Sequence, residues 1–534
     1  GPGFVVVVVN DGIAFYRKDG TQTYTNNMRQ TNGFWGSLAA SDDFIYDPET
    51  FYDTQTGRWF VMASQGNGNV NSAALVGVSD DSDPNGTWYL YKFDATGLAG
   101  DLFDSPNFGT DANVLYITGD GFGRGANYPV YCIEKAPLLS GQNPTIIRSA
   151  TLPTSTQSAG IPPVQDSGSR YYMIEHKEGG NNTSVDLIAL ANPLSSPSFT
   201  RFTLTVPAYA PPGDPPQSGS GSRVNTFDGR FWSVKYKNGF LWATHHINSR
   251  VVARWYQIDP RGWPTSGNNP VLVQSGQVDL GSDFYTFFSG IGVDDGNNAG
   301  IVYGRSRPSE FYSASHSSRR MTDALGTMSN HTIDKVSTGA YTGGRWGDYH
   351  DSEADPEFPG LMWGFAEWAE GQSWRAWVQP FYVTNELWAN VITPFKGTRT
   401  AGSYLDTIYD DNRVMSFRST PRLNVNDPFI GVEFRSKTRR TGQVSVNLQF
   451  AYQVDGAGFT LKTRLLNRNT GLYDLVDTRA ASLSEQLANV NVPNPTDYVQ
   501  ADGSISCRMT VEATGPVSSP VVNLSIDRWA WIEN

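Results

Sequence analysis

Short segments in which hydrophobic and polar residues alternate run through the first 385 residues. β-branched and aromatic residues occupy every second position, and Gly, Asn, Asp and Pro separate one segment from the next. A period of two is typical of a half-buried β-strand. Only 321–328 and 482–489 have a pattern that could supply a helical turn or two. Clear strand segments are 58–65, 113–121, 169–177, 239–247, 250–258, 299–306 and 361–368.

The strand segments recur at intervals of roughly 50 to 65 residues, which is the length of one repeated structural unit. Each unit starts at an acidic or glycine-containing turn and can supply a four-stranded blade. A blade cannot bury both of its faces alone, so blades must pack radially. The pattern therefore predicts an all-β fold with a six- or seven-bladed β-propeller in residues 1–390. A large β-sandwich or a β-helix is the alternative.

The N-terminal run FVVVVVN (4–10) is a strongly apolar strand. An unpaired edge of this kind would promote aggregation. We expect it to complete a seventh blade by pairing with the last one, or to pair with a second copy of the chain, which would produce an assembly.

The sequence pattern changes after 386–394. Residues 391–534 contain about eight strand segments joined by hairpin turns, which predicts a β-sandwich or jelly roll. The Pro- and Gly-rich stretch 207–223 lies earlier, between two predicted blades. We interpret it as a long surface loop, because the blade pattern resumes directly after it.

Composition narrows the class of protein. Charged residues make up 17% of the chain, and it contains 54 Gly, 31 Pro and 13% aromatic residues. These values suit a turn-rich β protein and exclude a helical bundle. The net charge of −12 argues against nucleic-acid binding, which requires basic patches. No uninterrupted apolar stretch approaches the roughly 18 residues that a transmembrane helix needs.

Two cysteines, Cys132 and Cys507, cannot form a disulfide framework, and we expect both to be small buried residues. Low cysteine and lysine content with abundant Asn, Ser, Thr and Gly is typical of secreted bacterial proteins. The first residues, GPGFVVVVVN, lack the charged region of a signal peptide, so we expect a mature or trimmed form. These features predict a secreted or cell-surface location.

Two resemblances support this interpretation. The segment RWGDY (345–349) is the most specific element of a pattern over about 40–385 that resembles a largely uncharacterised family of secreted bacterial β-propeller proteins. The resemblance implies a fold and export, but no activity. The C-terminal part resembles an accessory jelly-roll module of secreted bacterial proteins, some of them polysaccharide-active. Its matching segments are 397–418, 472–484, 497–516 and 525–534.

Propellers bind ligands where loops of several blades converge. A uronate lyase would use His, Tyr and Arg there to abstract and return a proton. Neighbouring strand residues point to opposite faces, so only one of His245 and His246 can enter a given pocket. The alternative is that the histidines are structural. The candidate ligand residues at the propeller mouth are His245, His246, Arg254, Arg345, Tyr349 and His350.

The RWGDY segment also has an architectural interpretation, in which Trp346 packs between blades and Arg345 pairs with Asp348. The acidic residues that follow could instead bind calcium, which prefers oxygen ligands, although their spacing differs from the 12-residue calcium loop. Asp348, Asp351 and Asp355 are the candidate metal ligands. Calcium is the only cofactor that the sequence suggests.

Aromatic residues suggest a second binding surface. Trp529 and Trp531 are two residues apart and therefore lie on one face of a strand, where they form either a glycan platform or part of the core. A sialidase is excluded, because SDDSDPNGTW (79–88) departs from the Ser-x-Asp-x-Gly-x-Thr-Trp box and no second copy is present.

Two functions follow from these features. The first is a non-catalytic extracellular protein that binds a polysaccharide or a cell-surface protein, including as a structural part of an assembly. The second is a polysaccharide-degrading enzyme, a glycoside hydrolase or a uronate lyase, acting at the propeller mouth.

Overall fold

A computed structural model describes residues 1–29, 32–39, 44–67, 70–95, 102–122, 127–153, 155, 157–422, 424, 427–440, 442–443, 445–516 and 521–533. The chain forms two compact units. Unit 1 comprises 1–293, 299–353 and 363–380, and unit 2 comprises 294–298, 354–362 and 381–534. The sequence predicted a single boundary at 390. In the structure, two short earlier segments, 294–298 and 354–362, also belong to unit 2.

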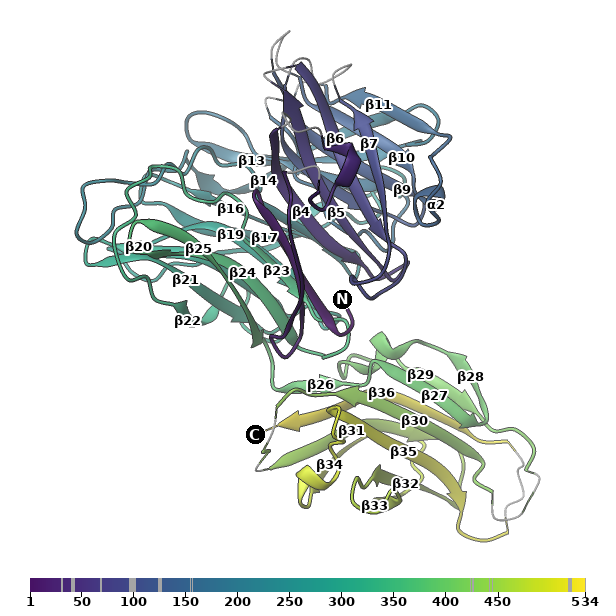
Figure 1. Ribbon diagram of the computed structural model, residues 1–534. Coiled ribbons are helices and arrows are strands. Elements are labelled where there is room, and N and C mark those ends of the chain that lie inside the picture. Colours follow the sequence, from purple (N-terminus) through teal and green to yellow (C-terminus); the bar gives the residue numbers. More distant parts are fainter. Residues whose placement is uncertain are drawn as a thin grey trace. The chain divides into compact units, whose positions relative to one another are not determined.

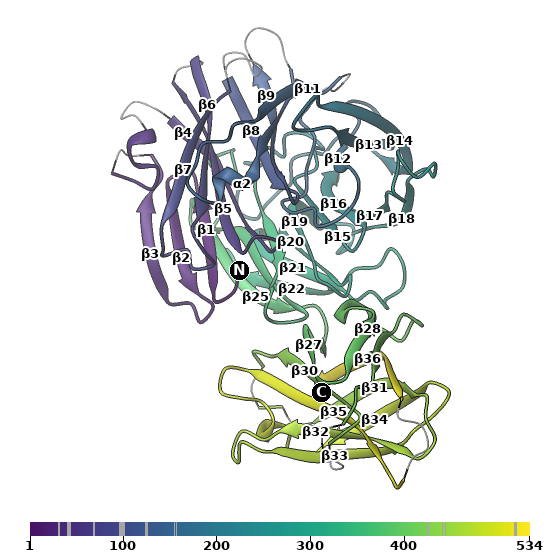
Figure 2. The same ribbon diagram turned by 90° about the vertical axis from the view of Figure 1, so that its right-hand side faces the viewer.

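The described part of unit 1 contains seven sheets, each built from strands that are consecutive in the chain. Figure 1 colours them in chain order from purple to green, and Figure 2 shows them from a second direction. This architecture confirms the prediction of an all-β propeller, with seven sheets.

The first four sheets contain fourteen of these strands. They are β1 (Phe4–Val9), β2 (Gly12–Arg17) and β3 (Gln22–Asn27); β4 (Phe44–Asp53), β5 (Arg58–Asn67), β6 (Val70–Ser79) and β7 (Trp88–Asp94); β8 (Leu102–Thr110), β9 (Val114–Phe122), β10 (Pro129–Glu134) and β11 (Ile147–Thr151); and β12 (Tyr171–Glu175), β13 (Asn182–Ala191) and β14 (Ser198–Tyr209).

The last three sheets complete the unit. They are β15 (Ser233–Lys237), β16 (Phe240–Ile247), β17 (Val252–Asp259) and β18 (Val271–Gln277); β19 (Tyr285–Val293), β20 (Ala299–Arg307), β21 (Glu310–Arg319) and β22 (Ser329–Lys335); and β23 (Asp351–Ala354), β24 (Leu361–Glu370) and β25 (Ser373–Tyr382).

Hydrophobic clusters lie between neighbouring sheets, as radial packing requires. Phe51 of β4 and Phe108 of β8 meet with ring centroids 4.8 Å apart. Tyr116 of β9 and Tyr171 of β12 stack at 3.8 Å across the next interface. A sheet that lies between two others is thus covered on both faces. This explains why β9 and β16 are buried along nearly their whole length.

The N-terminal run forms a hairpin instead of joining the last sheet. β1 pairs with β2 in antiparallel register, with Phe4 opposite Arg17, and the two form a separate sheet with β3. The expectation that this strand pairs with the last blade is therefore wrong. Because β1 is an edge strand of its sheet, pairing with a second copy of the chain stays a prediction. A turn at 10–11 brings the chain straight back, so the apolar strand finds a local partner.

Helical turns are also placed differently from the prediction. Residues 321–328 form turns, and 482–489 lead into the strand β34 (Gln486–Val492). A four-residue helix, α2 (Lys135–Leu138), occurs instead directly after β10. No helix among the described residues is long and apolar enough to cross a membrane.

Unit 2 is a sandwich of two sheets, which confirms the second fold prediction. Phe434 of one sheet and Trp529 of the other stack with centroids 5.9 Å apart in its core. One sheet has the order β28 (Thr398–Ala401), β29 (Met415–Arg418), β36 (Asn523–Glu533), β31 (Val446–Val454) and β34, with β26 (Glu386–Trp388) paired to β36. The other has the order β27 (Val391–Lys396), β30 (Ile430–Lys437), β35 (Ser504–Ala513), β32 (Phe459–Leu466) and β33 (Tyr473–Ala480).

Both cysteines are buried and free, Cys132 in unit 1 and Cys507 in unit 2. Burial raises the thiol pKa of each to about 12. Such thiols remain protonated and unreactive at neutral pH, as expected for small core residues.

Candidate functional site

Carboxylates from three distant segments of unit 1 converge at one place. They are Asp47 of β4, Asp104 of β8 and Asp348, three residues before β23. The side chain of Asp47 lies next to that of Asp104, and its Oδ2 accepts the backbone N–H of Ser105 at 3.3 Å. Burial, then the charges of Asp104 and Asp348, raise the pKa of Asp47 to about 7. We call these three residues the carboxylate triad.

The backbone is irregular at corresponding points of β4 and β8. This irregularity sets the direction of the Asp47 and Asp104 side chains. The register of β4 shifts between Tyr46 and Glu49, and that of β8 shifts between Asp104 and Asn107. Asp47 (φ 50°) and Ser105 (φ 47°) both have left-handed backbone, and a proline follows each of them. A β-bulge redirects side chains, and the strain of a non-glycine residue at positive φ is of order 1–3 kcal/mol. Such strain is concentrated at functional sites.

A second group of charges adjoins the triad. Glu49 of β4 accepts the backbone N–H of Phe108 at 3.3 Å, and burial raises its pKa to about 8. Lys235 of β15 forms ion pairs with Asp351 (3.0 Å) and with Glu353, both on β23. The Asp351 side chain is 39% exposed and that of Glu353 is 45% exposed, yet burial still raises the pKa of Glu353. Solvent therefore reaches the side chains of Asp351 and Glu353, although protein surrounds them.

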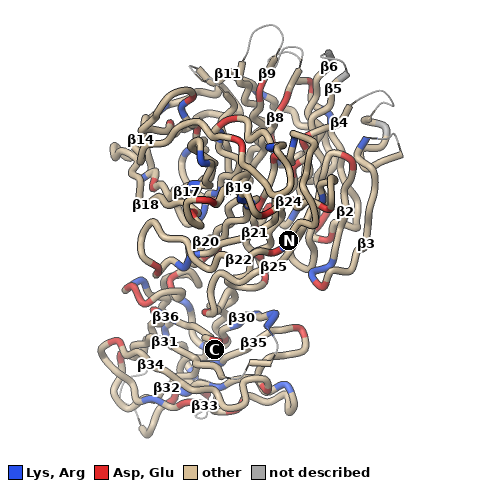
Figure 3. The backbone as a smooth tube through the Cα atoms, turned by 90° about the vertical axis from the view of Figure 1, so that its left-hand side faces the viewer, with Lys and Arg blue, Asp and Glu red and all other residues tan. Residues whose placement is uncertain are grey.

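Arginines balance part of this negative charge. Arg230 donates from Nη1 to Asp120 at 2.9 Å and from Nη2 to Asp228 at 2.8 Å. Burial opposes ionisation of Asp228, but the bonds to Arg230 outweigh it and lower the pKa of Asp228. Arg345 pairs with Asp348 at 3.2 Å. Figure 3 marks the basic residues in blue and the acidic residues in red along the backbone.

Aromatic side chains lie next to the triad. Trp232 contacts Tyr349 edge to face at 6.2 Å and Phe227 at 6.3 Å. The Arg345 guanidinium lies 4.4 Å from the Phe227 ring. All three rings are half-buried. Burial, then the charges of Asp47 and Asp348, raise the pKa of Tyr349 well above its usual range, so this phenol stays neutral. Aromatic faces beside carboxylates suit a sugar, which has apolar ring faces and hydroxyl edges.

Of the six residues predicted at the propeller mouth, Tyr349 and Arg345 therefore lie at the carboxylate triad. Their segment also has the architectural role considered above: Trp346 is 3% exposed and packs on Tyr341 and Tyr312, at 5.0 and 5.3 Å. Gly347 donates its N–H to the Glu367 carboxylate at 2.7 Å. The buried tryptophan and this hydrogen bond hold Asp348 and Tyr349 in place.

The three predicted histidines are buried instead. His245 hydrogen-bonds through Nδ1 to the Gly229 carbonyl at 2.7 Å and through Nε2 to the Tyr256 hydroxyl at 3.0 Å. His246 bonds the Thr226 carbonyl at 2.8 Å through Nε2, and its Nδ1 accepts the Phe288 N–H at 3.2 Å. Each ring therefore has both nitrogens engaged in the neutral form, and burial lowers the pKa of His246 to about 4.

His350 and Arg254 also serve the fold. His350 is 1% exposed, its Nε2 accepts the N–H of Glu367 at 3.2 Å, and burial lowers its pKa to about 3. Arg254 is 6% exposed and donates to two backbone carbonyls, of Pro207 at 2.8 Å and Ala208 at 2.9 Å. Both hold neighbouring backbone segments.

Trp529 and Trp531 are both fully buried in the core of unit 2. As the alternation predicts, they share a face, but that face points into the sandwich. They are core residues and not an exposed glycan platform, since a sugar could not reach either ring.

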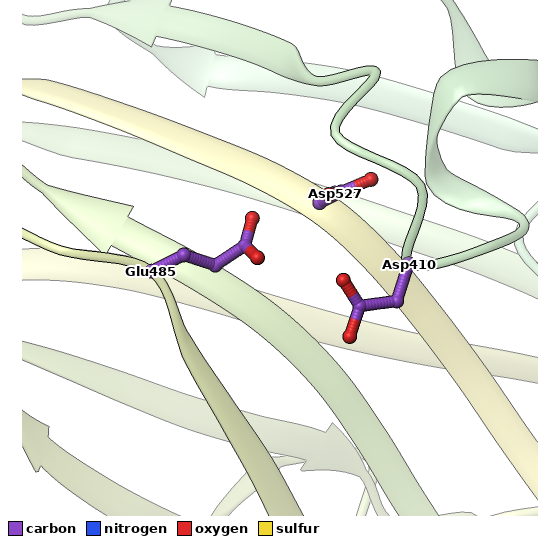
Figure 4. Close-up of side chains that lie close together, drawn as sticks. All are labelled: Asp410, Glu485 and Asp527. Carbon is purple, nitrogen blue, oxygen red and sulfur yellow. The ribbon is translucent and has the colours of Figure 1, made fainter.

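The three candidate calcium ligands do not form one group. Asp348 pairs with Arg345, and Asp351 pairs with Lys235. Asp355 belongs to unit 2 and accepts the backbone N–H groups of Glu357 (2.8 Å) and Phe358 (3.1 Å). Among the described residues, a different trio offers oxygens within 4.8 Å of one another: Asp410, Glu485 and Asp527 of unit 2 (Figure 4). Their oxygens suit a hard cation such as calcium.

Sequence reasoning missed the residues that matter most at this site, among them Asp47, Asp104, Arg230 and Trp232. A usable signal was present, because Asp-Pro and Ser-Pro interrupt strands β4 and β8. Proline within a strand indicates a bulge or an edge, and bulges often lie beside active sites.

No family model and no curated protein matches this chain. The resemblance to a propeller family therefore stays a prediction. Among solved structures, an exo-β-1,3-galactanase from Phanerochaete chrysosporium with β-1,3-galactotriose is 9% identical, with 99% of this chain and 95% of that chain covered and a TM-score of 0.28. A family 29 carbohydrate-binding module is 12% identical, with 26% and 75% covered and a TM-score of 0.18. At these TM-scores neither likeness carries an argument about this chain.

Proposed function

We propose that unit 1 binds a polysaccharide and hydrolyses its glycosidic bonds at the carboxylate triad. The observation that supports this most is that the β-bulges of β4 and β8 bring Asp47 and Asp104 together with Asp348. Burial and the charges of the two neighbouring carboxylates raise the pKa of Asp47 to about 7, so this side chain is partly protonated at neutral pH.

Glycosidic hydrolysis needs this combination of groups. One carboxylic acid protonates the leaving oxygen, and a second, ionised carboxylate activates water or attacks the sugar carbon. Asp47, with a pKa of about 7, is suited to be the acid, and Asp348, with a pKa raised by burial to about 6, is largely ionised at pH 7. In the hydrolytic cycle the bond from the anomeric carbon to the leaving oxygen breaks while the water oxygen forms a bond to that carbon. Asp47 gives its proton to the leaving oxygen, and Asp348 takes one from the attacking water. Asp348 then releases its proton to solvent and Asp47 regains one from it, which completes the cycle.

The neighbouring residues would position the substrate. Trp232 and Phe227 offer ring faces for stacking, and Arg345, whose side chain is 71% exposed, can donate to sugar hydroxyls. A polymer of sugars is met outside the cell, so this proposal agrees with the secreted or cell-surface location expected from the sequence.

A lyase that depends on His246 or His350 has less support, because those rings are buried, neutral and bonded to backbone. Non-catalytic binding of a glycan is the second candidate. The rings of Trp232 and Phe227 support it as much as they support hydrolysis, because stacking on a sugar needs no catalysis.

The test is to incubate the full chain with a panel of bacterial and algal polysaccharides and to identify new chain ends by mass spectrometry. Saturated ends are expected, and Asp47→Asn should reduce the rate by about 10²- to 10⁴-fold, the usual contribution of a general acid. The rate should also fall as pH rises above about 7, because Asp47 then loses its proton. Asp166→Asn, at an exposed aspartate of the same unit, is the matched control.

Other outcomes would contradict the proposal in different ways. Unsaturated ends would indicate a lyase. Binding of a glycan that Trp232→Ala weakens, with no new chain ends on any polymer, would replace hydrolysis with non-catalytic binding. Equal rates for Asp47→Asn and Asp166→Asn would place the chemistry elsewhere in the molecule.

A further inference from the structure

Unit 2 contains a cavity of about 340 Å³ that is separate from the carboxylate triad. Its wall is formed by the segment after β30, the turn between β32 and β33, and the segment that leads into β35. This volume lies at the lower end of the range for small-molecule sites, which is about 300–1,000 Å³. The cavity can therefore hold one small ligand.

Three arginines line this cavity: Arg439, Arg440 and Arg468. Asp502 is the only acidic residue among the described side chains of the lining. Arg440 is paired with Glu533, so the two carboxylates together offset two of the three guanidinium groups. The wall keeps a small surplus of positive charge in a chain whose net charge is −12, and such a surplus favours an anion.

The arginines differ in how far the protein already uses them. Arg440 is held by Glu533 at 3.2 Å and by the Thr384 carbonyl at 3.0 Å, with its guanidinium 4.0 Å from the Tyr382 ring. Arg468 is exposed, its backbone is fixed by a 2.8 Å bond to the Asp497 carbonyl, and its side chain forms no ion pair with any described residue. Arg468 therefore has donors to offer to a ligand.

Asp502 stays ionised and offsets part of the arginine charge. Its carboxylate accepts the hydroxyl of Ser504 at 2.7 Å and the Ser504 N–H at 3.0 Å, and these bonds lower the pKa of Asp502. Arg468 is therefore the guanidinium group that carries the argument for an anion.

The remaining wall suits a sugar. Phe358 contributes an aromatic ring, with the Arg439 guanidinium 5.9 Å from its centroid. Thr496 adds a hydroxyl group and Gln500 an amide, and both groups bond readily to sugar hydroxyls.

We propose that this cavity binds a small sugar that carries a carboxylate or a sulfate. The planar fork of a guanidinium matches both anions through paired N–H bonds, so Arg468 would hold the charged group while Thr496 and Gln500 contact the sugar hydroxyls. The site is independent of the proposed hydrolysis, because it lies wholly in unit 2 and uses no residue of the carboxylate triad.

The test is isothermal titration of the full chain with D-glucuronate, glucose 6-sulfate, inorganic sulfate and neutral glucose. We expect glucuronate or glucose 6-sulfate to bind, and the one that binds identifies the source of the anion. Arg468→Gln should weaken that binding by roughly tenfold, the usual loss for one charged hydrogen-bonding partner. Arg399→Gln removes the same charge from the exposed strand β28 and should change affinity less than about twofold.

Several results would overturn this proposal. They are glucose binding as tightly as glucuronate, inorganic sulfate binding as tightly as glucose 6-sulfate, no binding of either charged sugar, and equal affinities for Arg468→Gln and Arg399→Gln. The Asp47→Asn variant should bind the charged sugar normally, so a failure of the hydrolysis proposal would be distinguishable from a failure here.

Discussion

At the scale of single residues, the environment of Asp47 determines what its carboxyl group can do. An aspartate in water is ionised at neutral pH, whereas burial and two neighbouring carboxylates raise the pKa of Asp47 to about 7. The burial and the neighbouring charges that would make Asp47 a proton donor also make its ionised form unfavourable in the folded protein. Above about pH 7 this side chain therefore destabilises the fold, as residues of active sites commonly do.

This cost predicts how stability depends on pH. The pKa of Asp47 is raised on folding from its ordinary 3.8, so the folded state binds more protons than the unfolded state between about pH 4 and 7. The contribution of the Asp47 carboxyl group to the free energy of unfolding is fully present below about pH 4 and is lost as the pH rises to about 7. Asp47→Asn cannot ionise, and it should be more stable than the natural protein by about 1–2 kcal/mol at pH 8, after allowance for partial exposure.

Urea denaturation at pH 4 and pH 8 measures this difference. The advantage of Asp47→Asn should be much smaller at pH 4, where the natural side chain is protonated. Asp166→Asn, at an exposed residue, is the control that makes the same substitution outside the site. A stability difference for Asp47→Asn that is the same at both pH values would show that Asp47 titrates normally in the folded protein.

At the scale of elements, close backbone approach assembles the site. β19 packs against the segment 350–352 without side chains between them, because Gly290 and Gly292 face it. A Cβ atom at Gly290 would lie 2.4 Å from the Asp351 Cα and 2.4 Å from the His350 carbonyl oxygen. Both contacts are with backbone, which cannot rotate away. The glycines therefore hold β23, and the residues just before it, close to β19.

Gly290→Ala should accordingly destabilise unit 1 by about 2 kcal/mol or more and displace Asp348 and Tyr349. If the proposed hydrolysis is correct, activity should fall at temperatures where the variant is still folded. Thermal unfolding and activity at 25 °C measure the two effects. Gly221→Ala is the control, since a Cβ there meets nothing within 4 Å and its backbone is not left-handed. Equal stability of the two variants would contradict this account of the packing.

The elements also show which structural features the sequence pattern could not predict. The period of two located the strands, because it follows from alternating exposure along a pleated backbone. It did not reveal the bulges at Asp47 and Ser105, which break that period. The run 482–489 resembled a helix locally, but pairing with β31 made part of it the strand β34. Long-range pairing overrides local preference in such cases.

At the scale of the whole molecule, the two units have separate cores. The core of unit 2 is formed entirely by residues between 387 and 531. Trp529→Phe removes part of the stacking on Phe434 and should lower the unfolding temperature of unit 2, at a cost of about 1–3 kcal/mol.

Calorimetry of the full chain should then show one transition shifted and one unchanged. Any hydrolytic activity of unit 1 should be retained at 25 °C. The conservative change at an equally buried residue of unit 1, Trp242→Phe, should shift the other transition. A common shift of both transitions by either variant would show that the units unfold as one.

The sequence by itself determined the fold class, the division into a propeller and a sandwich, and the burial of both cysteines. These depend on composition, strand periodicity and turn residues, which are local properties of the chain. Only the tertiary structure decided which titratable groups meet. Asp47, Asp104 and Asp348 are separated by up to about 300 residues, and the sequence pattern around each is that of an ordinary turn or strand. Likewise, only packing decided that His245, His246, Trp529 and Trp531 face inward, because alternation shows which residues share a face but not which face is buried.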